Sequence, residues 1–220
     1  MEKAYDFLGI GDITIDAFIR ISQAEVRCDK DGENCKLCLN FADKVPYDDV
    51  IIVPAVGNAA NAAVAASRLG LHSALLTNLG DDKNGTDCIE ALQEENVGTQ
   101  FVAIRKSKKT NYHYVLWYKD DRTILVKHEQ YDYKLYDFDE PKWVYLSSLG
   151  ENSLPFHQEL TAYLNERPEI KLAFQPGTFQ IKLGKEALKD LYKRTDLFLC
   201  NKEEAQRILG LADDHDDVKS

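Results

Sequence analysis

The sequence predicts an α/β fold, in which a mostly parallel β-sheet carries helices on both faces and a small second β-sheet is attached. Short apolar segments that end in glycine or carboxylate residues alternate with helical segments, and this rhythm returns after residue 143. Such alternation is typical of parallel strands joined by right-handed crossovers. Two intervening segments show instead the alternating and aromatic patterns of antiparallel strands. We therefore expect an α/β core of residues 1–12, 56–97 and 134–220, and a small sheet of residues 13–55 and 98–133.

Composition excludes several classes of protein. The 220 residues are 44% hydrophobic and 29% charged, as in a globular chain of one or two domains that can bury a full core. A net charge of -10 argues against nonspecific nucleic-acid binding, which needs clustered Lys and Arg. No apolar run approaches the roughly 20 residues that cross a bilayer, and the N-terminus lacks a signal-peptide pattern. We expect a cytoplasmic protein with no membrane or nucleic-acid partner.

The first predicted strand, residues 5–12, ends in Gly11 and Asp12, as a buried parallel strand does. Asp12 is thereby placed at the carboxyl end of a strand. The next nine residues alternate in polarity, which predicts a strand with one solvated face that leaves the main sheet and carries Asp16.

The stretch from Val56 to Gly70 predicts a helix whose start faces a ligand. Asn58 and Asn61 are three residues apart and share the first turn, where unpaired N–H groups and the positive end of the helix dipole lie. Gly57 allows close approach of a polyol or an anion, and Gly70 ends the helix. The alternative, in which Gly57 is only a turn and Asn58 only an N-cap, stays open.

The remaining elements follow in order. We expect a strand that ends at Gly80, an aromatic hairpin and then three further strands, each followed by a helix. The ranges are a helix at 86–95, a hairpin at 111–118 and 123–126, strands at 143–148, 171–177 and 197–201, and helices at 154–166, 183–192 and 202–209, the last capped by Gly210.

Five cysteines are expected to be thiols or metal ligands in a reducing compartment. Cys28, Cys35 and Cys38 have spacing that suits a zinc knuckle, but a closed zinc site needs four ligands. Asp29, Asp31, a distant histidine or a second subunit are the candidates for the fourth, and three unligated thiols are the alternative. Cys88 and Cys200 lie in apolar settings and are expected to be buried.

Several motifs resemble those of the ribokinase/PfkB carbohydrate kinase family. Gly57-Asn58-Ala59-Ala60-Asn61 resembles its Gly-Gly-Asn-x-x-Asn helix, with Val56 in place of the first glycine, and Gly11-Asp12 followed by Asp16 resembles its first substrate-binding motif. Gly80-Asp81-Asp82-Lys83-Asn84-Gly85, Phe174-Gln175-Pro176-Gly177 and Asn201-Lys202-Glu203-Glu204 resemble its Gly-x-Asp-x-x-Gly, Asn-Pro-Gly and Asn-x-x-Glu signatures, with Gln175 a departure.

This resemblance implies a ribokinase-like three-layer sandwich with a β-sheet lid that closes over a sugar and forms a homodimer. It implies that ATP and Mg²⁺ are cofactors. Asn201 and Glu204 would help organise the Mg²⁺ and phosphate environment, although a helix N-cap and its capping box would look the same. The implied sugar-binding residues are Asp12, Asp16, Gly57, Asn58 and Asn61, of which the two carboxylates suit sugar hydroxyls; a capping Asp and a surface Asp are the alternative.

The implied activity is ATP-dependent phosphorylation of a sugar hydroxyl. Family members carry a later Gly-Ala-Gly-Asp loop with the catalytic base and an adenine pocket, and this sequence has neither that motif nor a Walker A pattern. We therefore place no catalytic residue in this chain, expect the base beyond Ser220 and expect the 220 residues alone to be inactive. The alternatives are a non-catalytic sugar-binding or dimerising module and a nucleoside kinase of the same family; the next stretch of coding DNA would discriminate kinase from module.

Overall fold

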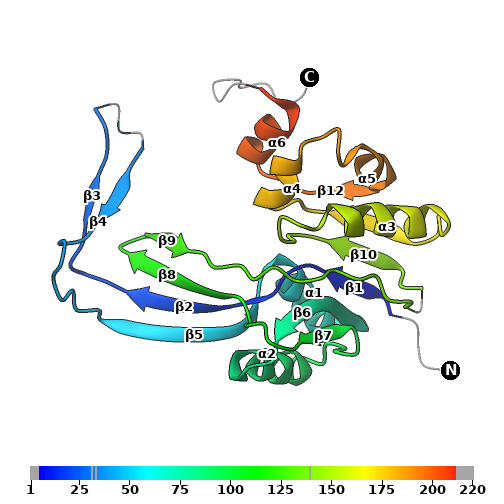
Figure 1. Cartoon of the computed structure of the whole chain (residues 1–220), viewed down its shortest axis with the longest axis horizontal. Helices are drawn as coiled ribbons and strands as arrows, with labels where there is room; N and C mark the ends of the chain where they lie inside the picture. The colour runs from blue at the N-terminus through cyan, green and yellow to red at the C-terminus, as the bar shows by residue number, and fades with distance from the viewer. Residues whose placement is uncertain (1–4, 31, 33, 139, 212–220) are drawn as a thin grey trace.

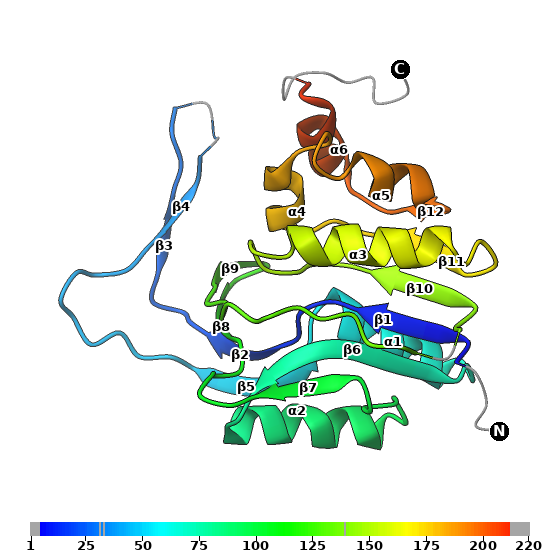
Figure 2. The same cartoon turned by 45° about the vertical axis from the view of Figure 1, so that its right-hand side comes forward.

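The core of the protein is a six-stranded sheet in the order β12-β11-β10-β1-β6-β7. A computed structural model describes residues 5–30, 32, 34–138 and 140–211. Every neighbouring pair in this sheet is parallel, and Figure 2 shows the strands stacked from β12 at the top to β7 near the bottom. The strands are β1 (Phe7–Ile10), β6 (Ser73–Gly80), β7 (Val102–Arg105), β10 (Trp143–Leu146), β11 (Lys171–Phe174) and β12 (Leu197–Phe198).

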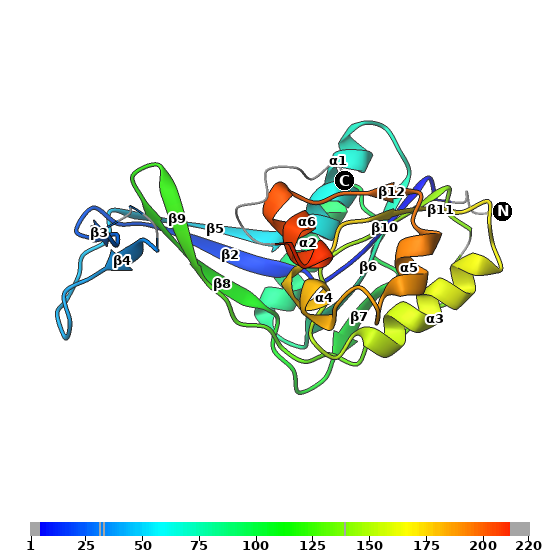
Figure 3. The ribbon, with the colours of Figure 1, turned by 90° about the horizontal axis from the view of Figure 1, so that it is seen from above.

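Helices cover both faces of this sheet, which confirms the three-layer sandwich. Successive side chains of a strand point to opposite faces. Val144 and Leu146 of β10 pack with α3 and α5, whereas Tyr145 packs in the second cluster with α1 and α2. Figure 3 shows α1 and α3 on opposite sides of the strands. The helices are α1 (Asn58–Arg68), α2 (Lys83–Glu94), α3 (Leu154–Asn165), α4 (Thr178–Leu183), α5 (Lys189–Arg194) and α6 (Lys202–Leu209).

A second sheet of four strands, here called the lid, projects from the core in the order β5-β2-β8-β9 (Figure 1). Pro54 lies in β5, an edge strand, where a residue without an N–H group is tolerated. A separate hairpin of two strands extends from the lid. The lid strands are β2 (Thr14–Arg20), β5 (Asp49–Val56), β8 (Tyr112–Tyr118) and β9 (Asp121–Leu125), and the hairpin strands are β3 (Glu25–Arg27) and β4 (Lys36–Cys38).

The structure corrects three expectations. Residues 98–133 do not all belong to the lid, because β7 pairs with β6 at the edge of the core sheet. The helix expected at 183–192 begins only at Lys189 as α5, since α4 ends at Leu183 and Gly184 has a φ of 84°. Cys88 is buried as expected, but Cys200 is exposed, because it follows β12, whose apolar side chains are 40% exposed or more.

Other expectations hold or fall outside the described residues. Gly70 and Gly210 have positive φ values after α1 and α6, which confirms both helix terminators. Residues 1–4 and 212–220 of the expected core lie outside the described residues. Within the described part of the chain, no helix is both long and apolar enough to span a bilayer.

Candidate functional site

A cavity of about 200 Å³ lies where the core meets the lid, after the carboxyl end of β1. The carboxyl ends of parallel strands are the usual place for a ligand in an α/β sheet. Elements far apart in the sequence build the cavity: the β1–β2 connection, the start of α1, strand β8, the segment after β9, the segment after β10 and the start of α4. They contribute, among others, Asp12, Asn58, His113, His128, Ser148 and Phe179.

Asp12 is the most unusual group in this cavity. Its side chain is buried, and the hydroxyl of Tyr133 donates a hydrogen bond of 2.8 Å to Oδ2. The N–H of Gly150 donates to the Tyr133 oxygen at 2.7 Å and so orients that hydroxyl. Oδ1 is buried, yet no hydrogen bond to it is found among the described residues. An unsatisfied buried carboxylate oxygen is costly, so a hydroxyl group of a ligand would be stabilised here.

Burial also changes the charge of Asp12. Desolvation raises the pKa of this carboxyl from 3.8 to about 7, although the hydrogen bonds from Tyr133 and Gly150 act in the opposite direction. The carboxyl therefore changes its charge close to neutral pH. A donor from a ligand would favour the ionised form, because it hydrogen-bonds to the charged oxygen.

Gly57 is required by the backbone at the start of α1. Its φ is 121°, and a Cβ there would lie 2.8 Å from the carbonyl oxygen of Asp12. The helix begins at Asn58 without a side-chain cap, and Asn58 lines the cavity. Three of the five expected sugar-binding residues, Asp12, Gly57 and Asn58, thus line one cavity. Asn61 is exposed and is not part of the lining, so its sugar contact stays a prediction.

Asp16 contacts a histidine that the sequence analysis did not identify. Its carboxylate Oδ1 lies 3.3 Å from Nδ1 of His113, whose ring lines the cavity. Asp16 itself is not among the lining residues, so its direct contact with a sugar stays a prediction. The His113 ring meets the ring of His128 edge-on at 5.2 Å, and His128 meets Phe179 in the same way at 5.7 Å. Desolvation of its ring, with a smaller effect of His113, lowers the pKa of His128.

Asn201 and Glu204 form a capping box at the start of α6. The Asn201 side chain accepts a 2.8 Å hydrogen bond from the Glu204 N–H, and Glu204 Oε2 accepts one of 3.0 Å from the Asn201 N–H. The capping interpretation of this motif is therefore confirmed. Capping uses one oxygen of each side chain. A role for Asn201 and Glu204 near Mg²⁺ stays a prediction.

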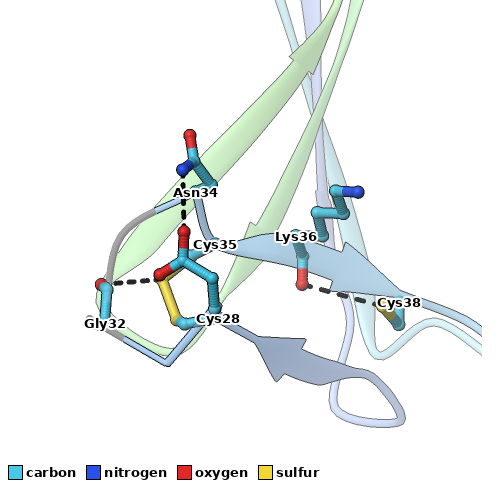
Figure 4. The surroundings of a disulfide bond; sticks show 7 residues. Cys28, Gly32, Asn34, Cys35, Lys36 and Cys38 are labelled. Carbon is cyan, nitrogen blue, oxygen red and sulfur yellow. Dashed lines mark hydrogen bonds between the residues drawn. A yellow bond between two sulfur atoms is a disulfide. The ribbon is translucent and has the colours of Figure 1, made fainter.

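The cysteine cluster differs from the zinc knuckle that the spacing indicates. Cys28 and Cys35 form a disulfide in the hairpin of β3 and β4, because antiparallel pairing of Arg27 with Lys36 brings the next residues together (Figure 4). Cys38 is free and its sulfur contacts the carbonyl of Lys36 at 3.7 Å. Among the described residues, which exclude Asp31, no three His, Cys, Asp or Glu side chains could hold a metal ion. The zinc prediction for these cysteines is wrong for this structure.

Comparisons with known proteins agree with this fold. A model of the pfkB family carbohydrate kinases matches residues 53–220. Mouse ribokinase is 24% identical over 162 residues, which cover 71% of this chain and 49% of the relative.

Two solved structures resemble the chain in fold. Ribokinase from Arabidopsis thaliana, solved with ribose and ATP, has a TM-score of 0.70 at 16% identity. The match covers 94% of this chain and 64% of the ribokinase chain. The nucleoside kinase of Methanocaldococcus jannaschii has a TM-score of 0.71 at 16% identity, with coverages of 95% and 64%. The chain thus spans about half the length of the mouse relative and less than two thirds of each of these structures.

Proposed function

This chain belongs to the pfkB family of carbohydrate kinases, and we propose that it forms the acceptor-binding part of an enzyme that transfers phosphate from ATP to a sugar hydroxyl. The observation that carries the proposal is the buried Oδ1 of Asp12, which has no hydrogen-bond partner among the described residues and belongs to a residue that lines the cavity. A carboxylate oxygen accepts hydrogen bonds from hydroxyl groups, and a sugar supplies several. Gly57 and Asn58 would contact the same ligand from the start of α1.

The cavity favours a small, uncharged acceptor. Its volume of about 200 Å³ is below the ~300–1,000 Å³ of sites that hold drug-sized ligands. A nucleoside is larger than a monosaccharide and would exceed this volume more readily. None of the described residues on its wall is Lys or Arg, the side chains that recognise phosphate groups. A sugar without a phosphate group therefore fits the lining better than a sugar phosphate does.

The phosphoryl side of the reaction would involve Asn201 and Glu204. Carboxylate and amide oxygens are suitable ligands for Mg²⁺, directly or through water, so the chemistry of this pair fits the ion. Mg²⁺ bound with ATP neutralises the charge that develops on the phosphates. We propose no catalytic base among the described residues, because the carboxylate on the cavity wall, Asp12, is assigned to holding the acceptor. On this proposal, phosphate transfer needs a catalytic base that we do not assign to any described residue.

The lid would exclude water and connect two copies of the chain. Water in the cavity would compete with the acceptor hydroxyl for phosphate.

The outer strands of the lid expose apolar side chains: Ile51 and Ile52 of β5 are 53% and 58% exposed, and Leu125 of β9 is 52% exposed. Exposed edge strands with apolar side chains are candidates for pairing with another chain. We propose a homodimer formed through the lid.

Calorimetric titration of this chain with D-ribose, D-fructose, adenosine and fructose 6-phosphate tests the acceptor assignment. We expect a monosaccharide to bind, and Asp12→Asn to weaken its binding by about tenfold or more, because a hydrogen bond to a charged group contributes roughly 1.5–3 kcal/mol. Asp120→Asn, in the exposed turn between β8 and β9, is the matched control. If adenosine alone binds, the protein is a nucleoside-binding member. If Asp12→Asn binds the sugar like the wild type, the acceptor site lies elsewhere.

A test of catalysis uses the product of the full coding sequence. ATP turnover that depends on the bound sugar supports the kinase. Sugar binding without turnover in a product whose coding sequence stops at Ser220 supports the alternative of a non-catalytic module.

A further inference from the structure

We propose that His113 recognises the acceptor directly through Nε2 and that Asp16 acts by positioning His113 rather than by contacting the sugar. This inference rests on the proposed sugar-binding function. It assigns a specificity-determining role to a lid residue, and a different role to a carboxylate expected to bind the sugar itself. The evidence is the geometry of the pair and the place of His113 on the cavity wall.

Strand pairing places the two side chains together. β2 and β8 are parallel neighbours in the lid, and Asp16 is the register partner of His113. The carboxylate Oδ1 of Asp16 lies 3.3 Å from Nδ1 of His113, which is within ion-pair distance, although no hydrogen bond to this oxygen is found among the described residues. The Asp16 and His113 side chains are 19% and 14% exposed. The ring orientation is therefore set by the sheet itself and by a largely buried charged neighbour. The ring of His128 also contacts the ring of His113, in an edge-on arrangement at 5.2 Å.

The contact with Asp16 favours one tautomer of His113 and so determines whether Nε2 accepts or donates a hydrogen bond. A carboxylate next to Nδ1 favours the proton on that nitrogen, as with other histidines oriented by a carboxylate. Nε2 is then the acceptor in the neutral ring, and a donor only when the ring is protonated. Nε2 is buried, and the described residues supply no hydrogen bond to it. A buried nitrogen without a partner is costly, so a ligand hydroxyl placed there would be stabilised.

Two unpartnered buried atoms therefore belong to residues on one cavity wall, Asp12 Oδ1 from the core and His113 Nε2 from the lid. Both accept hydrogen bonds in the charge states described above. A ligand that satisfies both needs at least two hydroxyl groups, as a polyol does. We infer that the cavity selects acceptors with hydroxyl groups on two sides. Asp12 of the core would bind one side and His113 of the lid the other.

A purely structural role for the pair makes a different prediction. If His113 only ties β8 to β2 through Asp16, replacing either residue lowers stability and leaves ligand selection unchanged. Two substitutions separate these roles, because the amide of glutamine lies near the position of Nε2 and the amide of asparagine near that of Nδ1. Rescue by glutamine alone is expected only if Nε2 makes the ligand contact.

The experiment combines titration with nitrogen NMR of the histidine rings. The probes are D-ribose and D-fructose, and the chain variants are His113→Gln, His113→Asn, Asp16→Ala and the double variant of Asp16→Ala with His113→Asn. His72→Gln is the control, since His72 is exposed and stacks on Tyr5 outside the cavity. Denaturation curves of each variant report stability separately.

We expect the Nε2 resonance of His113, assigned by its loss in the variants, to shift when the sugar binds. His113→Asn should weaken binding by about tenfold, and His113→Gln by less than about threefold. Asp16→Ala should also weaken binding, and should have little further effect in the His113→Asn background, because positioning acts through His113.

An unmoved Nε2 resonance, with sugar binding that still depends on Asp12, refutes the role of His113 and leaves the proposed function standing. Equal losses in the Gln and Asn variants, or additive losses in the double variant, refute the Nε2 contact or the positioning role of Asp16. Failure of both sugars to bind removes the proposed function and this inference with it. The NMR measurement uses the wild type, so the inference is tested even if a variant does not fold.

Discussion

Replacing Asp12 by asparagine is expected to change how the stability of the protein depends on pH. Burial raises the pKa of Asp12 from 3.8 to about 7 in the folded state. Between these values the folded protein binds a proton that the unfolded chain has released. Linkage then requires the wild type to lose stability as the pH rises through this window. The loss is complete above about pH 7, where the carboxyl is ionised in both states.

The interval between 3.8 and about 7 corresponds to about 4 kcal/mol, because each pKa unit is worth about 1.36 kcal/mol. The asparagine amide does not titrate, and its oxygen can still accept the hydrogen bond from the Tyr133 hydroxyl. We therefore expect Asp12→Asn to gain stability relative to the wild type by about 1.4 kcal/mol per pH unit from about pH 4 to pH 7, and then to stay level.

Urea unfolding of both proteins at a series of pH values across this window measures the difference. Asp120→Asn, which removes a carboxylate from an exposed turn, is the control and should run parallel to the wild type. Parallel curves for Asp12→Asn would refute the reasoning, because they would mean that Asp12 ionises in the folded state as it does in water. Sugar binding should show the reverse trend: its affinity rises as the pH approaches 7, since the ligand hydroxyl stabilises the ionised form.

Three other predictions follow from the local geometry. Gly57→Ala should cost more than about 1 kcal/mol in urea unfolding, since φ is 121° and the new Cβ would lie 2.8 Å from a carbonyl oxygen; a stability equal to the wild type would contradict this backbone. Alkylation of the unfolded, unreduced protein should label three of its five cysteines, Cys38, Cys88 and Cys200, as read by intact mass; five labels would mean that the disulfide does not form. Ile52→Lys should shift the sedimentation of the protein from dimer to monomer, because Ile52 is 58% exposed on β5; an unchanged dimer would place the interface elsewhere.

The elements of the core could be predicted because their patterns are local. A strand such as β6 (Ser73–Gly80), in which every residue is buried, is rich in apolar residues and ends in a glycine, and α1 is followed by a glycine that the sequence displays. The short helix α4 was missed and the next helix was expected to begin too early, because the break between α4 and α5 depends on the positive φ of Gly184.

The cysteine prediction failed for a different reason. Spacing alone shows that Cys28, Cys35 and Cys38 are close in sequence, and a zinc knuckle and a cross-strand disulfide both suit that closeness. The choice depends on the register of β3 and β4, which places Cys38 opposite Glu25 and brings Cys28 next to Cys35. Register is set by pairing across the hairpin and cannot be read from one strand.

The candidate site also combines residues that local motifs predict with residues that only long-range contacts bring in. Asp12, Gly57 and Asn58 belong to short motifs, so the sequence places them at the ends of elements that meet at the same edge of the sheet. Tyr133 and His113 have no such motif. Tyr133 reaches Asp12 across 121 positions, and His113 meets Asp16 only through the register of β8 on β2.

These long-range contacts have a functional consequence. Each carboxylate of the first motif is held by a side chain from the later part of the chain: Asp12 by Tyr133, and Asp16 by His113. The hydrogen bond from Tyr133 lowers the pKa of Asp12 against the larger effect of burial, and the register of β8 on β2 places His113 beside Asp16. Changes in the segment from β8 to Tyr133 can therefore alter which acceptor binds while the strand-end motifs stay the same. On the proposal made above, the choice of acceptor would depend on the lid and on the segment that returns from it to the core, and the strand-end motifs alone would leave the acceptor open.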